Sequence, residues 1–228
     1  MGMFDPIFHR LLGMDAISSA ALQASVYMSR YGITEEEVAA VSVKNHGNAR
    51  NNPYAQLPLS ITVEDVMRSR KIADPLKLLD CCPVSDGAAA VIIAGEEVAA
   101  RAKSKPVWIK GVAHCCEDYL LGDRDLADPV ALTDAARRAY AMAGIGNPRK
   151  EIDVAEVCEP YAFQELLWCE GLGLCGQGEG GRLGKPRHAK SDIPPHDLSP
   201  FEQTLRTRER ILLIFKKSDT PQCCPLPP

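Results

Sequence analysis

The stretch IDVAEVCEPYAFQELLWCEGLGLCGQGEGG, residues 152–181, carries the clearest fold signal in this chain of 228 residues. Residues 153–157 have the pattern of a buried strand, and a helix pattern begins near Tyr161. Gly171 and Gly173 would end that helix. Because α/β proteins bind ligands where a strand runs into a helix, we expect the chemistry of the chain at this junction.

The glycine-rich end of the stretch contains the letters G-x-G-x-x-G, at Gly171, Gly173 and Gly176. Dinucleotide-binding proteins place this motif after a strand and at the start of a helix, where helix amides meet the pyrophosphate. Here the motif follows a helix, and no strand–helix–strand unit comes after it. We therefore expect a turn that stops the helix and no dinucleotide site.

Cys158 lies at the junction, just before the predicted helix. The dipole at a helix N-terminus favours a thiolate, so one interpretation makes Cys158 a reactive or hydrogen-bonding group. The other is a packed thiol with no chemical role, since free cysteines are among the most buried residues. The residues alone leave both interpretations open.

Upstream of the junction, strand and helix patterns alternate. The continuous apolar run at 88–95 favours a strand buried on both faces, and 106–116 has an alternating strand pattern. Helix patterns occupy 96–103 and the region from Thr133, as a capping residue, to Gly144. This order predicts an α/β layered domain.

The first third of the chain lies outside this alternation and is helical in pattern. Asp15 is placed to cap a helix that Gly32 ends, and a capping box at Thr34 opens the next helix. A third helix pattern runs from Thr62 to the Asp-Pro pair that ends at Pro75. We expect this region to be an insertion or a cover over the α/β layers.

Charge and hydropathy exclude several classes of protein. The net charge is −4, and no interleaving of basic and aromatic residues indicates a nucleic-acid partner. The longest apolar runs are too short to span a bilayer, and the start of the chain lacks the pattern of a secretory signal. The sequence therefore predicts no membrane association and a cytoplasmic location.

Nine cysteines are present, six of them in the adjacent pairs 81–82, 115–116 and 223–224. An odd count, with neither a C-x-x-C motif nor a secretory signal, argues against a disulfide framework. His114 beside Cys115 leaves a metal site open, but zinc sites usually space their ligands. We expect no metal.

Three stretches resemble thiolases. Residues 85–106, SDGAAAVIIAGEEVAARAKSKP, resemble the segment in which a Ser/Asn-Asp-Gly-Ala-Ala-Ala motif opens a core strand. Residues 152–181 resemble the later segment with an N-E-A-F or H-D-C-F motif and a glycine turn, and residues 14–56 resemble the region that connects the two halves of the family. The resemblance covers roughly residues 5–183. It is strongest to the branch of sterol carrier protein 2 and archaeal acetyl-CoA acetyltransferases.

The resemblance implies an α/β fold with two similar halves in five layers (αβαβα), of which this chain would hold a part. Residues 1–80 would be the helical connecting region, 81–104 the last strand and helix of the N-terminal half, and 105–184 the start of the C-terminal half. Residues 185–228 lie outside the resemblance and are interpreted as a disordered, frameshifted or replaced tail. Most of the first half and the end of the second half would be missing.

The family transfers acyl groups between coenzyme A thioesters, by cleaving a 3-ketoacyl-CoA or by the reverse condensation, in fatty-acid and lipid metabolism. The resemblance implies this chemistry with a coenzyme A thioester as substrate and no covalently bound cofactor. The family's nucleophilic cysteine, its G-H-P histidine and its C-x-G cysteine have no counterpart here, so we expect the chain alone to be inactive.

Three functional hypotheses follow from the missing residues. The chain is a fragment of a thiolase, a half-enzyme whose partner chain supplies the other half, or a non-catalytic acyl-CoA-binding or scaffold subunit. Family members are usually dimeric, which makes a homo-oligomer a further expectation. Relatives in this branch also pair with a small zinc-ribbon and OB-fold protein, which makes such a protein a candidate partner.

Five residues match functional positions of the family. Cys158 stands where the family has the Asn or His that orients a water or binds an oxyanion, and Glu159 matches the acidic residue of the motif. Tyr161 matches its aromatic residue, while Cys82 falls near a serine beside the pantetheine arm of coenzyme A. Ser85 belongs to the strand-opening turn, although turn chemistry alone also explains a serine there. The resemblance therefore implies Cys158 and Glu159 as catalytic residues, and Cys82, Ser85 and Tyr161 as substrate-binding residues.

Overall fold

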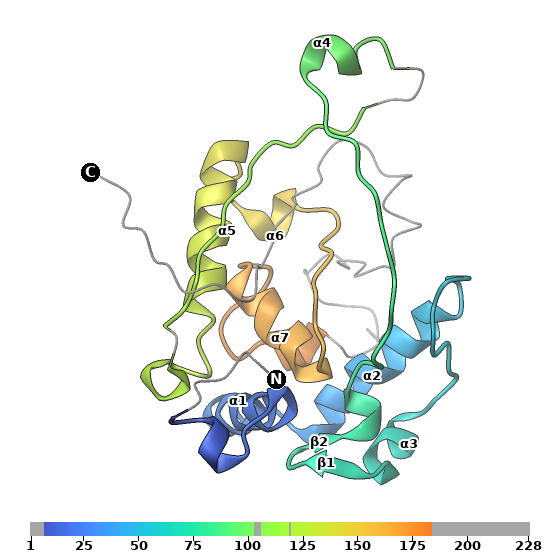
Figure 1. Ribbon diagram of the computed structural model, residues 1–228, viewed down its shortest axis with the longest axis vertical. Coiled ribbons are helices and arrows are strands. Elements are labelled where there is room, and N and C mark those ends of the chain that lie inside the picture. Colours follow the sequence, from blue (N-terminus) through green and yellow to red (C-terminus); the bar gives the residue numbers. More distant parts are fainter. Residues whose placement is uncertain (1–6, 103–105, 119, 184–228) are drawn as a thin grey trace.

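The computed structural model describes residues 7–102, 106–118 and 120–183. Its body is built from four helices, α1 (Ala16–Tyr31), α2 (Glu35–Ala49), α5 (Val130–Ala143) and α7 (Ala162–Gly171) (Figure 1). Helix α7 lies among the other three, and contacts join it to each of them. The predicted tail at 185–228 lies outside the described residues.

The shorter elements surround this body. The described residues form one small antiparallel sheet, in which Lys71 pairs with Lys77 and Ala73 with Leu76. The remaining elements are η1 (Arg10–Leu12), α3 (Val63–Arg68), β1 (Lys71–Ala73), β2 (Leu76–Lys77), η2 (Leu78–Asp80), α4 (Glu96–Ala99), η3 (Leu121–Asp123), α6 (Pro148–Glu151) and α8 (Gly180–Leu183).

The predicted helix starts in the first third are confirmed. The Asp15 carboxylate accepts a hydrogen bond from the amide of Ser18 at 2.7 Å, and Thr34 forms the capping box that begins α2. Gly32 ends α1 in the left-handed conformation, at φ 67°. These signals are local, because each cap bonds an amide within three residues.

Two boundary predictions are wrong. The helix that begins after Thr62 ends at Arg68 rather than at Pro75, and the intervening residues form β1. Helix α5 ends at Gly144 as predicted but begins at Val130, after Pro129, so Thr133 is inside it and is not its cap. The amide of Thr133 already donates to the carbonyl of Pro129 at 2.9 Å. Proline just before the first helical turn supplied the start signal that the prediction overlooked.

The strands predicted at 88–95, 106–116 and 153–157 do not form within the described residues. Their backbone is extended, but it pairs with no neighbouring strand there. A strand requires neighbours that satisfy its N–H and C=O groups, and the apolar pattern of a segment cannot supply them. These predictions were therefore correct in the extended conformation and wrong in the pairing.

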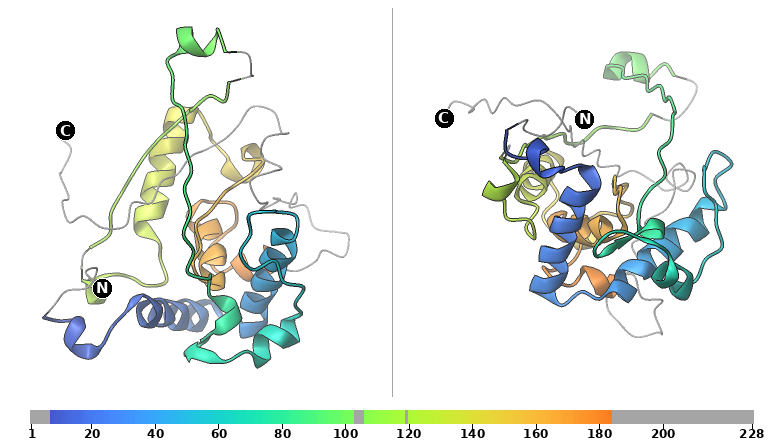
Figure 2. Two further views of the ribbon diagram at one scale, coloured as in Figure 1. Left: turned by 45° about the vertical axis from the view of Figure 1, so that its right-hand side comes forward. Right: turned by 60° about the horizontal axis from the view of Figure 1, so that its bottom comes forward.

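Residues 84–102 and 106–113 form a long arm that extends away from the body, with α4 near its tip (Figures 1 and 2). The returning part of the arm touches α5 at Gly111, which is buried. A β-carbon at Gly111 would lie 2.2 Å from the carbonyl oxygen of Ala139. Only a glycine allows the chain to pass α5 this closely.

Helix α7 is buried along nearly its whole length. Phe163 and Leu166 belong to a hydrophobic cluster shared with α1 and α2, and Cys169 belongs to a second cluster shared with α5. A helix that is buried on all sides must be enclosed by protein. Helix α7 is thus the element common to both parts of the core.

The glycine turn after α7 packs on the helices and does not open a new strand–helix unit. Gly178 has φ 72°, and a β-carbon there would lie 2.8 Å from the Tyr31 ring. The amide of Gly180 donates to the Glu170 carboxylate at 2.9 Å, which also accepts from the hydroxyl of Tyr27. The prediction that these glycines stop a helix is confirmed, since α7 ends at Gly171.

Tyr140 tests how strongly the second cluster is held. Its buried hydroxyl donates to the carbonyl of Leu172 at 2.9 Å, so Tyr140→Phe should lower the free energy of unfolding by about 1 kcal/mol. Urea unfolding followed by circular dichroism measures the change. Tyr54→Phe is the control, because the Tyr54 ring is exposed, and equal losses in both variants would contradict the prediction.

Lys77 and Asp80 form a buried ion pair between β2 and η2. The Lys77 ammonium lies 3.3 Å from the Asp80 carboxylate and 2.8 Å from that of Glu35. Asp80 also accepts hydrogen bonds from the hydroxyl of Ser42, at 3.2 Å, and from the backbone amide of Lys77, at 3.1 Å. This network ties the segment before the candidate site to helix α2.

Candidate functional site

An isolated antiparallel bridge brings the two candidate segments together. Cys81 pairs with Tyr161, and the amide of Cys82 donates to the carbonyl of Pro160 at 2.8 Å. This pairing joins segments about 80 residues apart in sequence. It places Cys82 beside Cys158 and Glu159.

The end of the predicted strand is fixed by α7. Tyr161 is the residue before the first turn of α7, with an extended backbone at φ −133° and ψ 137°. The indole Nε1 of Trp168, two turns into α7, donates to the carbonyl of Cys158 at 3.1 Å. The Cys158 side chain remains exposed. The backbone of the junction is therefore held in place while its thiol stays accessible.

Ser85 lies apart from this cluster. It is exposed, and its hydroxyl donates to the side-chain oxygen of Gln56. The Gln56 amide in turn donates to the carbonyl of Val84 at 3.3 Å. Of the five predicted site residues, the structure brings four together and leaves Ser85 at the base of the arm.

Glu159 is the most unusual side chain of the site. Its carboxylate is largely enclosed, and its Oε2 atom has no hydrogen-bond partner among the described residues. Burial raises the pKa of Glu159 to about 8, with a smaller contribution from the nearby Glu165 carboxylate, while Lys44 acts in the opposite direction. Near neutral pH, Glu159 is therefore largely protonated and can donate a proton or a hydrogen bond.

Two residues of α2 complete the site and were not predicted. The Lys44 ammonium pairs with the Glu165 carboxylate, which also accepts from the side-chain amide of Asn45 at 2.8 Å. Lys44 follows the buried Val41 by three residues, so it lies on the same face of the helix. That spacing was the signal that could have revealed it.

The thiols of the site and Tyr161 favour their neutral forms. Burial raises the pKa of Cys81 to about 11, with Asp80 adding to the effect, and raises the pKa of Tyr161 to about 12. Burial also raises the pKa of Cys82, with Cys158 and Glu159 contributing. Neither Cys81 nor Cys82 is therefore an activated thiolate at neutral pH.

Metal ligands and membrane spans were also considered. Across 7–102, 106–118 and 120–183, no three His, Cys, Asp or Glu side chains gather as a metal site requires. In the same ranges, every helix is too short or too polar to cross a bilayer.

The pKa of Glu159 makes a prediction for stability. Because its folded-state pKa is raised, the favourable contribution of the protonated form is present below about pH 4.5 and is lost as pH rises through 8. Glu159→Gln removes this loss, so the variant should gain about 2–3 kcal/mol over the parent chain between pH 4.5 and pH 9. Urea unfolding across this pH range measures the difference, with Glu36→Gln on the exposed start of α2 as control. A difference that does not change with pH would contradict the prediction.

Comparison with known proteins gives matches over both halves of the chain. Residues 9–97 match the family described as thiolase, N-terminal domain, and residues 113–193 match the thiolase C-terminal domain-like family. The two matches follow one another in sequence order and leave only a short interval between them.

Individual relatives agree with these matches. The acetyl-CoA acetyltransferase of Methanothermobacter thermautotrophicus is 44% identical over 171 residues, which is 75% of this chain and 44% of that protein. The benzoylsuccinyl-CoA thiolase subunit BbsB of Thauera aromatica is 36% identical over 70% of this chain and 41% of its own length. The solved structure of the Ltp2-ChsH2(DUF35) aldolase has a TM-score of 0.71 and 29% identity, over 78% of this chain and 48% of that chain.

The chain thus spans less than half the length of each of these relatives. Within that span, the N-terminal and C-terminal domain matches, the 44% identity and the structural similarity agree. The chain belongs to the thiolase superfamily, and its α/β fold is a partial thiolase fold.

Proposed function

We propose that this chain forms part of the active site of a thiolase-type acyltransferase that acts on acyl-CoA and 3-ketoacyl-CoA thioesters. The observation that carries the proposal is the bridge between Cys81 and Tyr161, which gathers Cys82, Cys158 and Glu159 at one point. Acetyl-CoA acetyltransferases and a CoA thiolase subunit among the relatives support the substrate class.

In the proposed reaction, Glu159 assists charge changes on the thioester. Its carboxyl is largely protonated near neutral pH, and Oε2 is free to meet a carbonyl oxygen or a water. Cys158 occupies the position from which the family orients a water or oxyanion, though a thiol is a weak hydrogen-bond donor. Cys82 and Tyr161 would line the path of the pantetheine arm, and Ser85 would meet it nearer the arm of the protein.

The acyl-carrying cysteine is expected from outside this chain, so the isolated chain should not turn over. The relatives support work in an assembly: one is named as a subunit, and the structural neighbour is a two-component aldolase by its title. We therefore propose a homo-oligomer or a partner chain, with a zinc-ribbon and OB-fold protein as a further candidate. A cytoplasmic role in fatty-acid or lipid metabolism follows from the same proposal.

A covalent chimera tests the proposed chemistry without requiring any assembly. The 171 matched residues of the Methanothermobacter acetyl-CoA acetyltransferase are replaced by the corresponding residues of this chain. We expect the chimera to consume acetoacetyl-CoA in the presence of coenzyme A, whereas this chain alone does not. The unmodified archaeal enzyme is the positive control.

The outcome distinguishes the two candidate functions. Turnover by the folded chimera supports thiolase chemistry at this site. A folded chimera that binds acetyl-CoA in calorimetry but has no turnover contradicts it and favours a non-catalytic acyl-CoA-binding subunit. A folded chimera that neither binds nor turns over acetoacetyl-CoA contradicts both.

A further inference from the structure

The arm exposes an unusual amount of apolar surface. Val91, Ile92 and Ile93 are 83%, 95% and 78% exposed. The returning segment also exposes large apolar side chains, Val107, Trp108, Ile109 and Val112. Single exposed apolar residues are ordinary, but a contiguous run of this kind marks an interaction surface.

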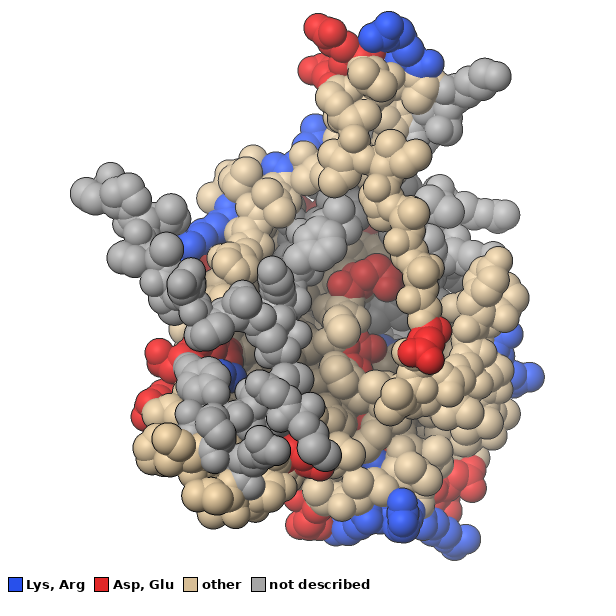
Figure 3. All heavy atoms as spheres, viewed as in Figure 1, with Lys and Arg blue, Asp and Glu red and all other residues tan. Residues whose placement is uncertain are grey.

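Both faces of the outgoing segment are apolar. Successive residues of an extended chain point to opposite faces, so the consecutive Val91, Ile92 and Ile93 present apolar side chains on each. No charged residue occurs from 88 to 95, and Figure 3 shows an uncharged surface along the arm below the charged residues of α4. Such a segment is suited to the interior of a sheet that is covered on both sides.

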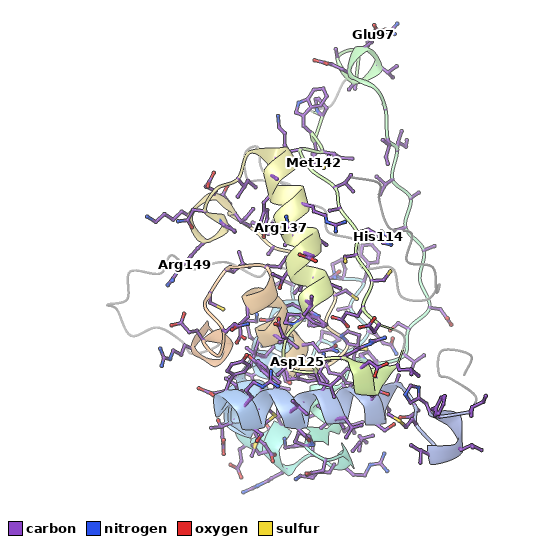
Figure 4. All side chains as sticks on the ribbon, turned by 90° about the vertical axis from the view of Figure 1, so that its left-hand side faces the viewer. Glu97, His114, Asp125, Arg137, Met142 and Arg149 are labelled. Carbon is purple, nitrogen blue, oxygen red and sulfur yellow. The ribbon has the colours of Figure 1, made fainter. Side chains whose placement is uncertain are left out.

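The arm is also positioned to reach beyond the body. Figure 4 shows Glu97 at its far tip, well past the end of α5 marked by Met142. The returning segment is anchored where Gly111 meets Ala139. The outgoing segment has no such anchor in the described residues, and its extended backbone leaves N–H and C=O groups for another chain to pair with.

We infer that the arm is a docking element that adds two strands, 84–95 and 106–113, to the β-sheet of a second polypeptide. This inference rests on the proposed function, since the outgoing strand begins two residues after Cys82. A docked partner would therefore place its own sheet beside the candidate site. That is where an acyl-carrying cysteine has to come from.

The expected occupant is a polypeptide with an α/β sheet, of the kind that makes up the rest of the relatives. More than half of the length of each relative lies outside its match to this chain. A second copy fits less well, because the sheet in the described residues has strands of only three and two residues. It offers no preformed edge that could cover a strand on both faces.

The probe for this docking is the part of the Methanothermobacter enzyme that precedes its match, produced as a separate polypeptide together with this chain. We expect a one-to-one complex in size-exclusion chromatography with light scattering. Amide hydrogen exchange of residues 84–95 and 106–113 should slow at least about tenfold in the complex, since strand pairing protects backbone amides.

Two variants separate docking from folding. Ile92→Lys should abolish the complex and leave the circular dichroism of the chain unchanged, because the side chain is already exposed in the free chain. Tyr54→Lys is the matched control, since Tyr54 is 93% exposed outside the arm and the complex should persist.

Several results would overturn the inference. These are an arm that exchanges equally fast with and without the probe, a complex that tolerates Ile92→Lys, and a homodimer that protects the arm without the probe. The test is independent of the chimera. An active chimera whose separated parts do not associate removes the docking inference alone, while a complex without turnover in either form removes only the proposed function.

Discussion

Asp80→Ala is expected to lower the free energy of unfolding by about 3–5 kcal/mol, the range for removing one member of a buried ion pair. The side chains of Lys77 and Asp80 are 2% and 1% exposed. Without Asp80, the Lys77 ammonium stays buried with the partly exposed Glu35 carboxylate as its remaining charged partner. The Ser42 hydroxyl loses its acceptor as well. Because Glu35 still neutralises part of the charge, we expect a value near the lower end of the range.

Urea unfolding followed by far-ultraviolet circular dichroism at pH 7 measures this loss. Glu64→Ala is the matched control, because the Glu64–Arg68 pair is 64% and 79% exposed and should contribute no more than about 0.5 kcal/mol. The double variant Lys77→Met, Asp80→Ala should recover much of the stability, since it leaves no buried charge unpaired. A loss below about 1 kcal/mol for Asp80→Ala alone would show that the pair is not buried as described.

Glu159→Gln in the chimera is expected to lower kcat by about 100-fold or more, the range for losing a positioned general acid or base. Glutamine keeps the size of the side chain and its hydrogen-bonding capacity but cannot exchange a proton. The pH profile of kcat/KM should lose the inflection near pH 8 that the raised pKa of Glu159 predicts for the parent chimera. Steady-state assays with acetoacetyl-CoA and coenzyme A from pH 6 to pH 9.5 measure both effects.

A merely structural role for Glu159 would give a different pattern. In that case Glu159→Gln would change thermal stability but keep the inflection near pH 8. Glu36→Gln serves as the control, since Glu36 is exposed at the start of α2, far in sequence from the junction, and both kcat and the pH profile should stay unchanged. If Glu159→Gln retains the parent profile, Glu159 is not the group that exchanges the proton.

The helices could be predicted from sequence because their signals are local. Asp15, Thr34 and Gly144 each act within one helical turn, and each marks a boundary that the structure confirms. The strands could not be predicted in the same way. The run at 88–95 has the composition of an inner strand, yet composition carries no information about which neighbour pairs with it.

The candidate site was predicted in part for a related reason. The resemblance located Glu159 and Tyr161 within one motif, and it located Cys82 in another. That the two motifs meet depends on the Cys81–Tyr161 bridge, a contact between distant segments. Lys44 was missed because its role depends on the packing of α2 against α7, which a helix pattern alone does not reveal.

Helix α7 also determines how the molecule comes apart. Since α7 belongs to both hydrophobic clusters, it cannot detach without opening the whole core, and the bond from Trp168 binds the Cys158 junction to the same cooperative unit. The arm, with few buried contacts, can fluctuate at almost no cost in free energy. Limited proteolysis should therefore cut between 84 and 102 long before it cuts between 158 and 171. The rigid and the adaptable parts of this protein meet within a few residues of Cys82.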